Sequence, residues 1–252
     1  MRKIFLTFII VFLILINCSD KYSDFEPGLT LTGEVKFKST NTIEKVGQFV
    51  YSVPTGYNPK TSWPLIITLH GYGSNAMAFH DLFKSVTDTM GFVLLTPQGD
   101  LSVENNFGWT WGDDSERLIL TCLDLISKDI HIDRNRIYLI GFSAGGRLTY
   151  YLGLKYSNIF RGIATLSSPF DETILSGNKI INKSLKIYIG YGSLEKRISI
   201  EAMNAKSTLE KLGLNIETKR YDGIGHGLPE PKEKELCIIL EYLNSKKITP
   251  ER

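Results

Sequence analysis

Ser143 is the residue of this 252-residue chain whose setting best suits a nucleophile. It lies between Gly141 and Gly145, an apolar run ends just before it, and an apolar pattern with helical spacing begins just after it. A strand, a tight turn and a helix in that order form a nucleophile elbow, which holds a strained serine at the end of a sheet. The helix N-terminus adds partial positive charge where an oxyanion would form. The pattern predicts acyl transfer, unless Ser143 is an ordinary serine in a glycine-rich turn.

Acyl transfer also needs two backbone N–H groups that point at the developing oxyanion. One normally belongs to the residue after the nucleophile, here Ala144, and the other to the loop after an earlier strand. Tyr72 occupies that second place, in the run His70-Gly71-Tyr72-Gly73 that follows an apolar stretch. We expect His70 itself to be a structural member of this loop.

A general base is the next requirement, and the chain has four histidines. His226 lies in the run Asp222-Gly-Ile-Gly-His226-Gly, where glycines on both sides allow the backbone to turn an imidazole toward Ser143. His80 falls in a helical pattern and His131 at the start of a strand, so both are expected at the surface or as caps. The sequence therefore predicts His226 as the base.

The acid of such a triad comes between the serine and the histidine along the chain. Glu195 follows an apolar strand in the run Gly190-Tyr-Gly-Ser-Leu-Glu195 and is the predicted acid. Asp171 follows the preceding strand and is the alternative. The carboxylate would fix the imidazole tautomer and stabilise the imidazolium.

The elements that must position these residues alternate between strand and helix from residue 64 onward. That order calls for a mostly parallel sheet with helices on both faces. Apolar runs and alternation predict strands over residues 34–38, 48–53, 64–70, 92–96, 136–140, 162–166, 185–189 and 215–221. Helical spacing predicts helices over residues 76–90, 113–130 and 200–212, one after the elbow, and a last one around residues 236–243.

A long irregular loop is expected over residues 98–112. Its aromatic residues Phe107, Trp109 and Trp111 are candidates for a substrate-binding platform, with core packing as the alternative. Between residues 166 and 185 there is room for one short helix but not for a large cap. An uncapped site suits short acyl chains or an ester of a bulky alcohol.

Composition excludes several classes of function. The formal net charge is +2 and the basic residues are scattered, so nothing indicates nucleic-acid binding. No histidine and carboxylate grouping has metal-ligand spacing, and no dinucleotide or phosphate-binding fingerprint occurs, so no metal or other cofactor is expected. Cys122 and Cys237 fall in helices predicted on opposite faces of the sheet, which favours two free thiols.

Residues 1–18 are typical of an export signal. Met1-Arg2-Lys3 is followed by an apolar run to Ile16 that is shorter than the ~20 residues needed to span a bilayer. Cys18 follows at once, as in a bacterial lipoprotein signal, with an uncleaved anchor or simple secretion as alternatives. We expect a polar tether over residues 19–33, a single catalytic domain over 34–248, and an exported lipoprotein at the cell surface or in the periplasm.

The chain from about residue 48 to 243 resembles the α/β-hydrolase superfamily, and within it the exported group of feruloyl esterases, polyhydroxybutyrate depolymerases and carboxylesterases. The resemblance is carried by Val53-Pro-Thr-Gly-Tyr57, Pro64-Leu-Ile-Ile-Thr-Leu-His-Gly71, Gly91-Phe-Val to Pro97-Gln-Gly99, and Ile132-Asp-Arg-Asn-Arg-Ile-Tyr-Leu-Ile-Gly-Phe-Ser-Ala-Gly-Gly146. Gly192-Ser-Leu-Glu195 departs from the Gly-Thr-x-Asp segment that such enzymes often show at the acid.

This resemblance implies a three-layer sandwich around a sheet of about eight strands, and a monomeric serine esterase. Its substrates would be small-molecule or polymeric esters of the short-acyl, feruloyl or glycan-linked kind. An acyltransferase, a thioesterase, a phospholipase or a peptidase could use the same triad. From a different class, the chain could be a non-catalytic surface-binding lipoprotein on a hydrolase scaffold.

Overall fold

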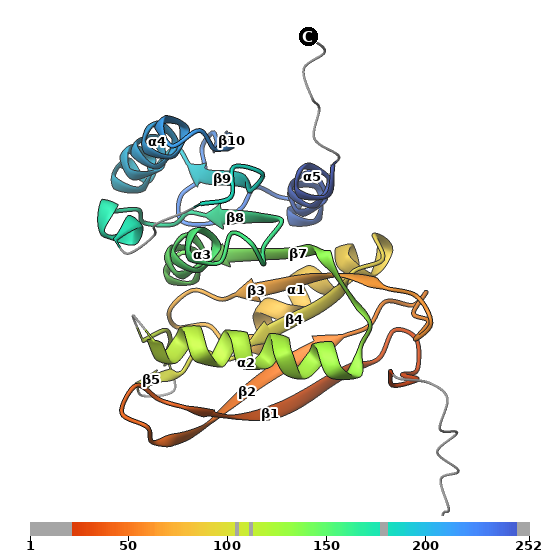
Figure 1. The fold of residues 1–252 in the computed structure, drawn as a ribbon. Helices are drawn as coiled ribbons and strands as arrows, with labels where there is room; N and C mark the ends of the chain where they lie inside the picture. Colours follow the sequence, from red (N-terminus) through yellow and green to blue (C-terminus); the bar gives the residue numbers. More distant parts are fainter. Residues whose placement is uncertain (1–21, 104–105, 111–112, 177–180, 246–252) are drawn as a thin grey trace, which may run out of the picture.

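The computed structural model describes residues 22–103, 106–110, 113–176 and 181–245. Cys18, Trp111 and the predicted signal segment 1–18 lie outside the described residues. Figure 1 shows the elements, which follow one another as β1 (Thr30–Lys38), β2 (Glu44–Ser52), β3 (Trp63–Leu69), α1 (Ala76–Thr89), β4 (Val93–Pro97), β5 (Leu101–Val103), β6 (Asn106–Gly108), α2 (Asp113–Asp129), β7 (Ile132–Phe142), α3 (Ala144–Lys155), β8 (Gly162–Leu166), the 3-10 helix η1 (Glu172–Leu175), β9 (Lys186–Gly192), α4 (Lys196–Lys211), β10 (Asn215–Tyr221) and α5 (Lys232–Asn244).

Eight strands form one sheet in the order β1-β2-β4-β3-β7-β8-β9-β10. β2 runs antiparallel to both of its neighbours, β1 and β4, and every other neighbouring pair is parallel. β4, β8 and β9 are buried along their whole length, as parallel strands covered on both faces should be. The predicted α/β-hydrolase fold with a mostly parallel sheet of eight strands is confirmed, and no cap is evident in the described residues.

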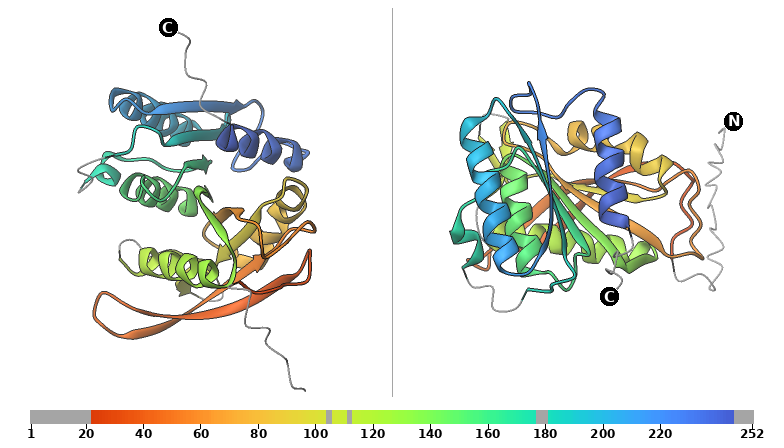
Figure 2. Two further views of the ribbon diagram at one scale, coloured as in Figure 1. Left: turned by 45° about the vertical axis from the view of Figure 1, so that its right-hand side comes forward. Right: turned by 90° about the horizontal axis from the view of Figure 1, so that it is seen from above.

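Two cores lie on opposite faces of this sheet. Helices α2, α3 and α4 pack on one face and helices α1 and α5 on the other, and the right-hand view of Figure 2 shows α3 and α4 on the opposite side of the sheet from α1 and α5. Strand β3 serves both cores, because Leu65 and Ile67 face the first and Ile66 faces the second. Cys122 on α2 and Cys237 on α5 therefore lie on opposite faces as expected, and both are free.

The structure corrects several expected boundaries. The loop over residues 98–112 contains a hairpin of β5 and β6, whose backbone pairs with the loop after β3 through a bridge between Ser74 and Phe107. Helix α4 begins at Lys196 rather than residue 200, and Ile198 in its first turn extends the buried stripe of Ala202, Ala205 and Leu209 toward the N-terminus.

The expected tether over residues 19–33 is also partly folded. β1 begins at Thr30, and Phe25 and Leu29 pack against the larger core. The hydroxyl of Tyr57 donates a hydrogen bond to the carbonyl of Ser23 (3.0 Å). The catalytic domain therefore takes in the second half of the predicted tether.

Within the described ranges, no helix combines the length and the apolar character needed to cross a membrane.

Candidate active site

Ser143 lies at the C-terminal end of the central strand β7, directly before helix α3. Its backbone has φ 54° and ψ −118°, a conformation that non-glycine residues rarely adopt and that costs on the order of 1–3 kcal/mol. The turn is tight enough that a Cβ atom on Gly141 would lie 2.4 Å from the carbonyl oxygen of Gly145. A Cβ atom on Gly145 would lie 2.2 Å from the carbonyl oxygen of Leu69. Both glycines are therefore sterically required, as expected of a nucleophile elbow.

The loop after β3 passes directly beside Ser143. A Cβ atom on Gly71 would lie 3.3 Å from the Ser143 Cβ atom, so this backbone approaches the elbow at van der Waals distance. Neither the N–H of Tyr72 nor that of Ala144 has a hydrogen-bond acceptor in the described part of the chain. The structure thus brings both predicted oxyanion donors to the elbow with their N–H groups unused.

His70 holds this loop in place. Its side chain is fully buried, and Nε2 accepts a hydrogen bond from the N–H of Gly99 (3.0 Å). The proton therefore lies on Nδ1, which donates to the carbonyl oxygen of Gly71 (2.8 Å). Burial lowers the pKa of His70, which keeps the ring neutral. This position agrees with a structural role.

Glu195 and His226 form a close pair. Nδ1 of His226 lies 2.6 Å from Oε1 of Glu195, and the glutamate side chain is the more buried of the two. Glu195 occupies the N-cap position of α4 without a side-chain capping hydrogen bond, and the helix dipole favours a carboxylate there. Its Oε2 atom is buried and has no hydrogen-bond partner in the described residues.

The loops that carry Glu195 and His226 lie in close contact because position 192 is a glycine. A Cβ atom there would lie 2.2 Å from the carbonyl oxygen of Gly225 and 2.4 Å from that of Ile224. The N–H of Leu194 also donates to the carbonyl of Ile224 (3.0 Å). The loop after β9 and the loop after β10 therefore set each other's position.

The imidazole lies beside the elbow. The ring centroids of His226 and Phe142, the residue before Ser143, are 4.7 Å apart. About half of the His226 side chain (48%) is exposed. No hydrogen bond joins Ser143 Oγ to His226 among the described residues, which is common before a substrate closes the geometry.

Asp171, the alternative acid, has other partners. Its Oδ2 atom accepts a hydrogen bond from the guanidinium of Arg147 (2.7 Å), and its Oδ1 atom accepts one from the N–H of Thr173 (3.0 Å). Bonds from Thr173 and the charge of Arg147 hold the pKa of Asp171 below its ordinary value. Of the two carboxylates, the structure places Glu195 against His226.

The three predicted aromatic residues have different outcomes. Trp109 is buried (4% exposed), and its indole N–H donates to the carbonyl of His70 (2.7 Å). It supports the loop from within the core, in agreement with the core-packing alternative for this residue. Phe107 is partly exposed and lines a cavity. Trp111 lies outside the described residues.

His80 is not at the surface as expected. It is fully buried, and its ring nitrogens lie 3.1 Å from Thr96 Oγ1 and 3.2 Å from Ser52 Oγ. Burial lowers its pKa to about 4. His80 lies four residues after Ala76 and three before Phe83, so helical spacing puts it on the buried face of α1, and the expected surface position is wrong.

A cavity of about 390 Å³, which sequence reasoning missed, opens beside the oxyanion loop. Its wall is mostly apolar and consists of Gly71, Tyr72, Ser74, Ala78, Phe79, Leu82, Phe83, Phe142, Leu166, Gly227, Leu228 and Lys232. Because Phe142 precedes the elbow serine and Gly227 follows His226, this cavity adjoins the predicted reaction centre. The sequence contains one indication of this cavity, because part of the apolar stripe of α1 faces it.

No three His, Cys, Asp or Glu side chains of the described residues are grouped closely enough to hold a metal ion.

Comparison with known proteins supplies independent information. The model of the phospholipase/carboxylesterase family matches residues 57–246. A bifunctional acetylxylan esterase/xylanase of Neocallimastix patriciarum is 30% identical over 111 residues, which cover 42% of this chain and 16% of that protein. A poly(3-hydroxybutyrate) depolymerase of Ralstonia pickettii is 28% identical over 150 residues, covering 52% of this chain and 30% of that protein. The chain thus matches less than a third of the length of either relative.

The fold has close counterparts among solved structures. A ferulic acid esterase superposes with a TM-score of 0.70 over 87% of this chain and 98% of that chain. The two sequences are 15% identical, so the superposition establishes a shared fold.

Proposed function

We propose that this chain, which belongs to the phospholipase/carboxylesterase family and is a carboxylesterase-type hydrolase, cleaves its substrate with Ser143 as nucleophile, His226 as base and Glu195 as acid. The observation that carries the assignment is the 2.6 Å contact between Glu195 Oε1 and His226 Nδ1. A carboxylate at this distance accepts a hydrogen bond from Nδ1–H, which keeps the proton on Nδ1 and leaves Nε2 free as a base. The ring packs against Phe142, the residue directly before the strained serine, which places the imidazole beside the elbow.

The reaction then has two steps. His226 removes the Ser143 proton as Oγ attacks the ester carbonyl, and the N–H groups of Tyr72 and Ala144 stabilise the oxyanion. The intermediate expels the alcohol, which takes its proton from His226. Water then attacks the acyl-enzyme with His226 again as base, and the carboxylic acid leaves.

The apolar cavity indicates which part of the ester binds where. Phe79, Phe83 and Leu228 offer an apolar surface beside the oxyanion loop, suited to an aliphatic or aromatic acyl group. A volume of about 390 Å³ accommodates a short chain or a single phenyl-propenoyl group of the feruloyl kind. The relatives' substrates, acetylated xylan and poly(3-hydroxybutyrate), are polymeric esters, which supports a short acyl group on a bulky alcohol.

The chain acts outside the cytoplasm, held at a membrane by a lipid on Cys18. The support is the sequence Met1-Arg2-Lys3, the apolar run up to Ile16 and the cysteine directly after it. Labelling with a radioactive fatty acid tests this anchor in cells that express wild type or Cys18→Ser. Equal labelling of the two would contradict it.

The test of the mechanism compares wild type with Ser143→Ala on short-chain nitrophenyl esters. In a well-studied triad protease, loss of the serine costs about 10⁶ in kcat, and we expect the variant to fall to background. Ser167→Ala is a matched control, because Ser167 is a buried serine that also has positive φ (46°) but follows β8. A Ser143→Ala variant with most of its activity left would refute the proposed nucleophile.

A further inference from the structure

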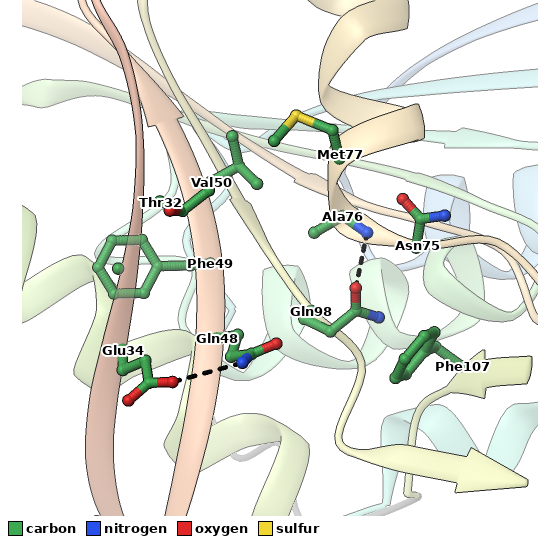
Figure 3. Close-up of a pocket in the computed structure, with 11 residues that line it drawn as sticks. Thr32, Glu34, Gln48, Phe49, Val50, Asn75, Ala76, Met77, Gln98 and Phe107 are labelled. Atoms are coloured by element: carbon green, nitrogen blue, oxygen red, sulfur yellow. Dashed lines mark hydrogen bonds between the residues drawn. The ribbon is translucent and has the colours of Figure 1, made fainter. Parts of the chain in front are cut away.

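A second cavity, of about 550 Å³, lies on the other side of the oxyanion loop and takes no part in the mechanism above. It is formed by residues of β1 and β2, the start of α1 and the hairpin residue Phe107. Figure 3 shows Gln48 and Gln98 between Glu34 on one side and Phe107 on the other, with Met77 on the α1 side. The full wall comprises Thr32, Gly33, Glu34, Gln48, Phe49, Val50, Asn75, Ala76, Met77, Gln98 and Phe107.

The polar groups of this wall are amides, a hydroxyl and one carboxylate. Glu34 and Gln48 face each other across the β1–β2 pair, and a long hydrogen bond of 3.4 Å joins their side chains. In contrast, Gln98 is fixed, because its Oε1 accepts the N–H of Ala76 (2.9 Å) and its Nε2 donates to His70. An amide N–H of Gln98 and most of the hydrogen-bonding capacity of Gln48 and Glu34 stay available to a ligand.

The apolar part of the wall combines the buried side chains of Phe49, Val50 and Ala76 with the more exposed Met77 and Phe107. Met77 is 42% exposed, and the ring of Phe107 forms the side opposite Glu34. An exposed ring or thioether opposite a row of amides suits a ligand with one apolar face and a hydroxylated edge. Sugar rings have that shape: their C–H groups stack on an aromatic face and their hydroxyls both donate and accept.

The charged side chains of the wall limit which class of ligand this cavity can bind. The described residues of this wall include the carboxylate of Glu34 but no Lys, Arg or His side chain. An anionic ligand would meet this negative charge and would find no cation to pair with among the residues of the wall. The cavity therefore favours a neutral, polyhydroxylated ligand.

The loop after β3 connects the cavity to the reaction centre. Tyr72 lies beside the elbow and Asn75 lines the cavity, and three residues of chain span at most about 11 Å. The loop between them is tied to Phe107, whose carbonyl accepts the N–H of Gly73 (2.9 Å). A polymeric alcohol whose ester carbonyl is bound beside Ser143 would reach this cavity with a neighbouring unit, whereas a small ester would not.

We propose that the cavity formed by Glu34, Gln48, Gln98, Met77 and Phe107 is a subsite for a neutral oligosaccharide that forms the alcohol part of the substrate. This inference rests on the ester hydrolysis proposed above, and it assigns to the hydrolase a class of alcohol. Binding of sugar units here holds the scissile ester at the oxyanion loop. The subsite contributes to substrate binding and leaves the chemistry at Ser143 unchanged.

The test uses the intact protein with two substrates, nitrophenyl acetate and acetylated xylotetraose. Gln48→Ala and Glu34→Ala each remove hydrogen bonds to the sugar, so we expect KM for the acetylated tetrasaccharide to rise about 3- to 10-fold. Thr32→Trp fills the cavity and should raise this KM further. Kinetics on nitrophenyl acetate should be unchanged in all three variants. Lys36→Ala is the matched control, because Lys36 is exposed on the same strand but does not line the cavity.

A second measurement separates failure of the subsite from failure of the mechanism. Ser143→Ala should bind unesterified xylotetraose with the wild-type Kd in calorimetry, and Thr32→Trp should weaken that binding at least 10-fold. If the cavity variants hydrolyse acetylated xylotetraose with wild-type KM, the subsite is refuted while the mechanism stands. If Ser143→Ala stays active but the cavity variants alter sugar binding, the mechanism fails and the subsite stands. Binding of an acidic oligogalacturonide as tight as that of xylotetraose would also overturn the proposal.

Discussion

Replacing Glu195 with glutamine tests how the proposed base is prepared for its task. The carboxylate oxygen lies 2.6 Å from Nδ1 of His226 and accepts a hydrogen bond from Nδ1–H, which leaves Nε2 unprotonated and able to take the Ser143 proton. A glutamine of the same shape can place its NH₂ group at that position. The amide would then donate to Nδ1 and favour the opposite tautomer, in which Nε2 carries the proton. The variant should fold normally and lose kcat.

The size of the loss follows from the surroundings of the pair. In a serine protease triad, the equivalent change of acid to amide lowers kcat about 10⁴-fold. His226 is half exposed, so water can partly replace the carboxylate at Nδ1. We therefore expect a smaller loss of about 10³, which corresponds to roughly 4 kcal/mol at 1.36 kcal/mol per tenfold change.

The assay is steady-state hydrolysis of nitrophenyl acetate, with thermal unfolding of each variant recorded alongside. Asp171→Asn is the matched control, because Asp171 is bonded to Arg147 and Thr173 rather than to His226. It breaks a partly exposed ion pair, so it should cost at most about 1 kcal/mol of stability and change kcat less than threefold. A large loss of kcat in Asp171→Asn, with Glu195→Gln close to wild type, would refute the reasoning.

Three further predictions concern stability. Positions 225 and 227 have open space where a methyl group would lie and no left-handed φ, so Gly225→Ala and Gly227→Ala should each raise the free energy of unfolding by about 0.5 kcal/mol in urea titration. Tyr221→Phe removes a hydrogen-bond donor to the buried carboxylate of Glu235 (2.9 Å) and should lower the free energy of unfolding by about 2 kcal/mol. His80 has a folded-state pKa of about 4 against 6.5 unfolded, so the unfolded chain binds the proton first and stability should fall by about 3 kcal/mol as pH drops from 6.5 to 4.

Each of these has its own control. Gly223→Ala should destabilise, in contrast to its neighbours, because Gly223 has φ +73°. Tyr242→Phe should cost little, since the Tyr242 hydroxyl makes only long hydrogen bonds of 3.4 and 3.5 Å. His80→Gln should flatten the loss of stability between pH 6.5 and 4. Equal effects of Tyr221→Phe and Tyr242→Phe, or an unchanged pH dependence in His80→Gln, would contradict the structural reasons given.

The elbow could be predicted from sequence because Gly141, Ser143 and Gly145 lie within one short turn between a strand pattern and a helix pattern. The contacts that require Gly141 and Gly145 arise within one turn and the strand beside it. The loop that carries the base could also be predicted, because His226 lies between glycines after the last strand. The choice between Glu195 and Asp171 needed the fold, because both follow strands at comparable places in the chain.

The features that sequence reasoning missed depend on segments far apart in the chain. Trp109 has the sequence context of a free loop aromatic, but its indole supports the carbonyl of His70. His80 was expected to be exposed, but its partners Thr96 and Ser52 come from two other strands. Both cavities likewise combine residues from several elements, and no local spacing records such a combination.

The sheet order places the proposed catalytic groups in regions of unequal local stability. Ser143 ends β7, which has paired strands on both sides, whereas His226 follows β10 at the open edge of the sheet. β10 is largely exposed, and strands of this kind are the first to open in local unfolding. Amide hydrogens of β10 should therefore exchange faster than those of β7. On warming, detachment of β10 would withdraw the base while the rest of the sheet persists, so the hydrolase would switch off reversibly below its global melting temperature.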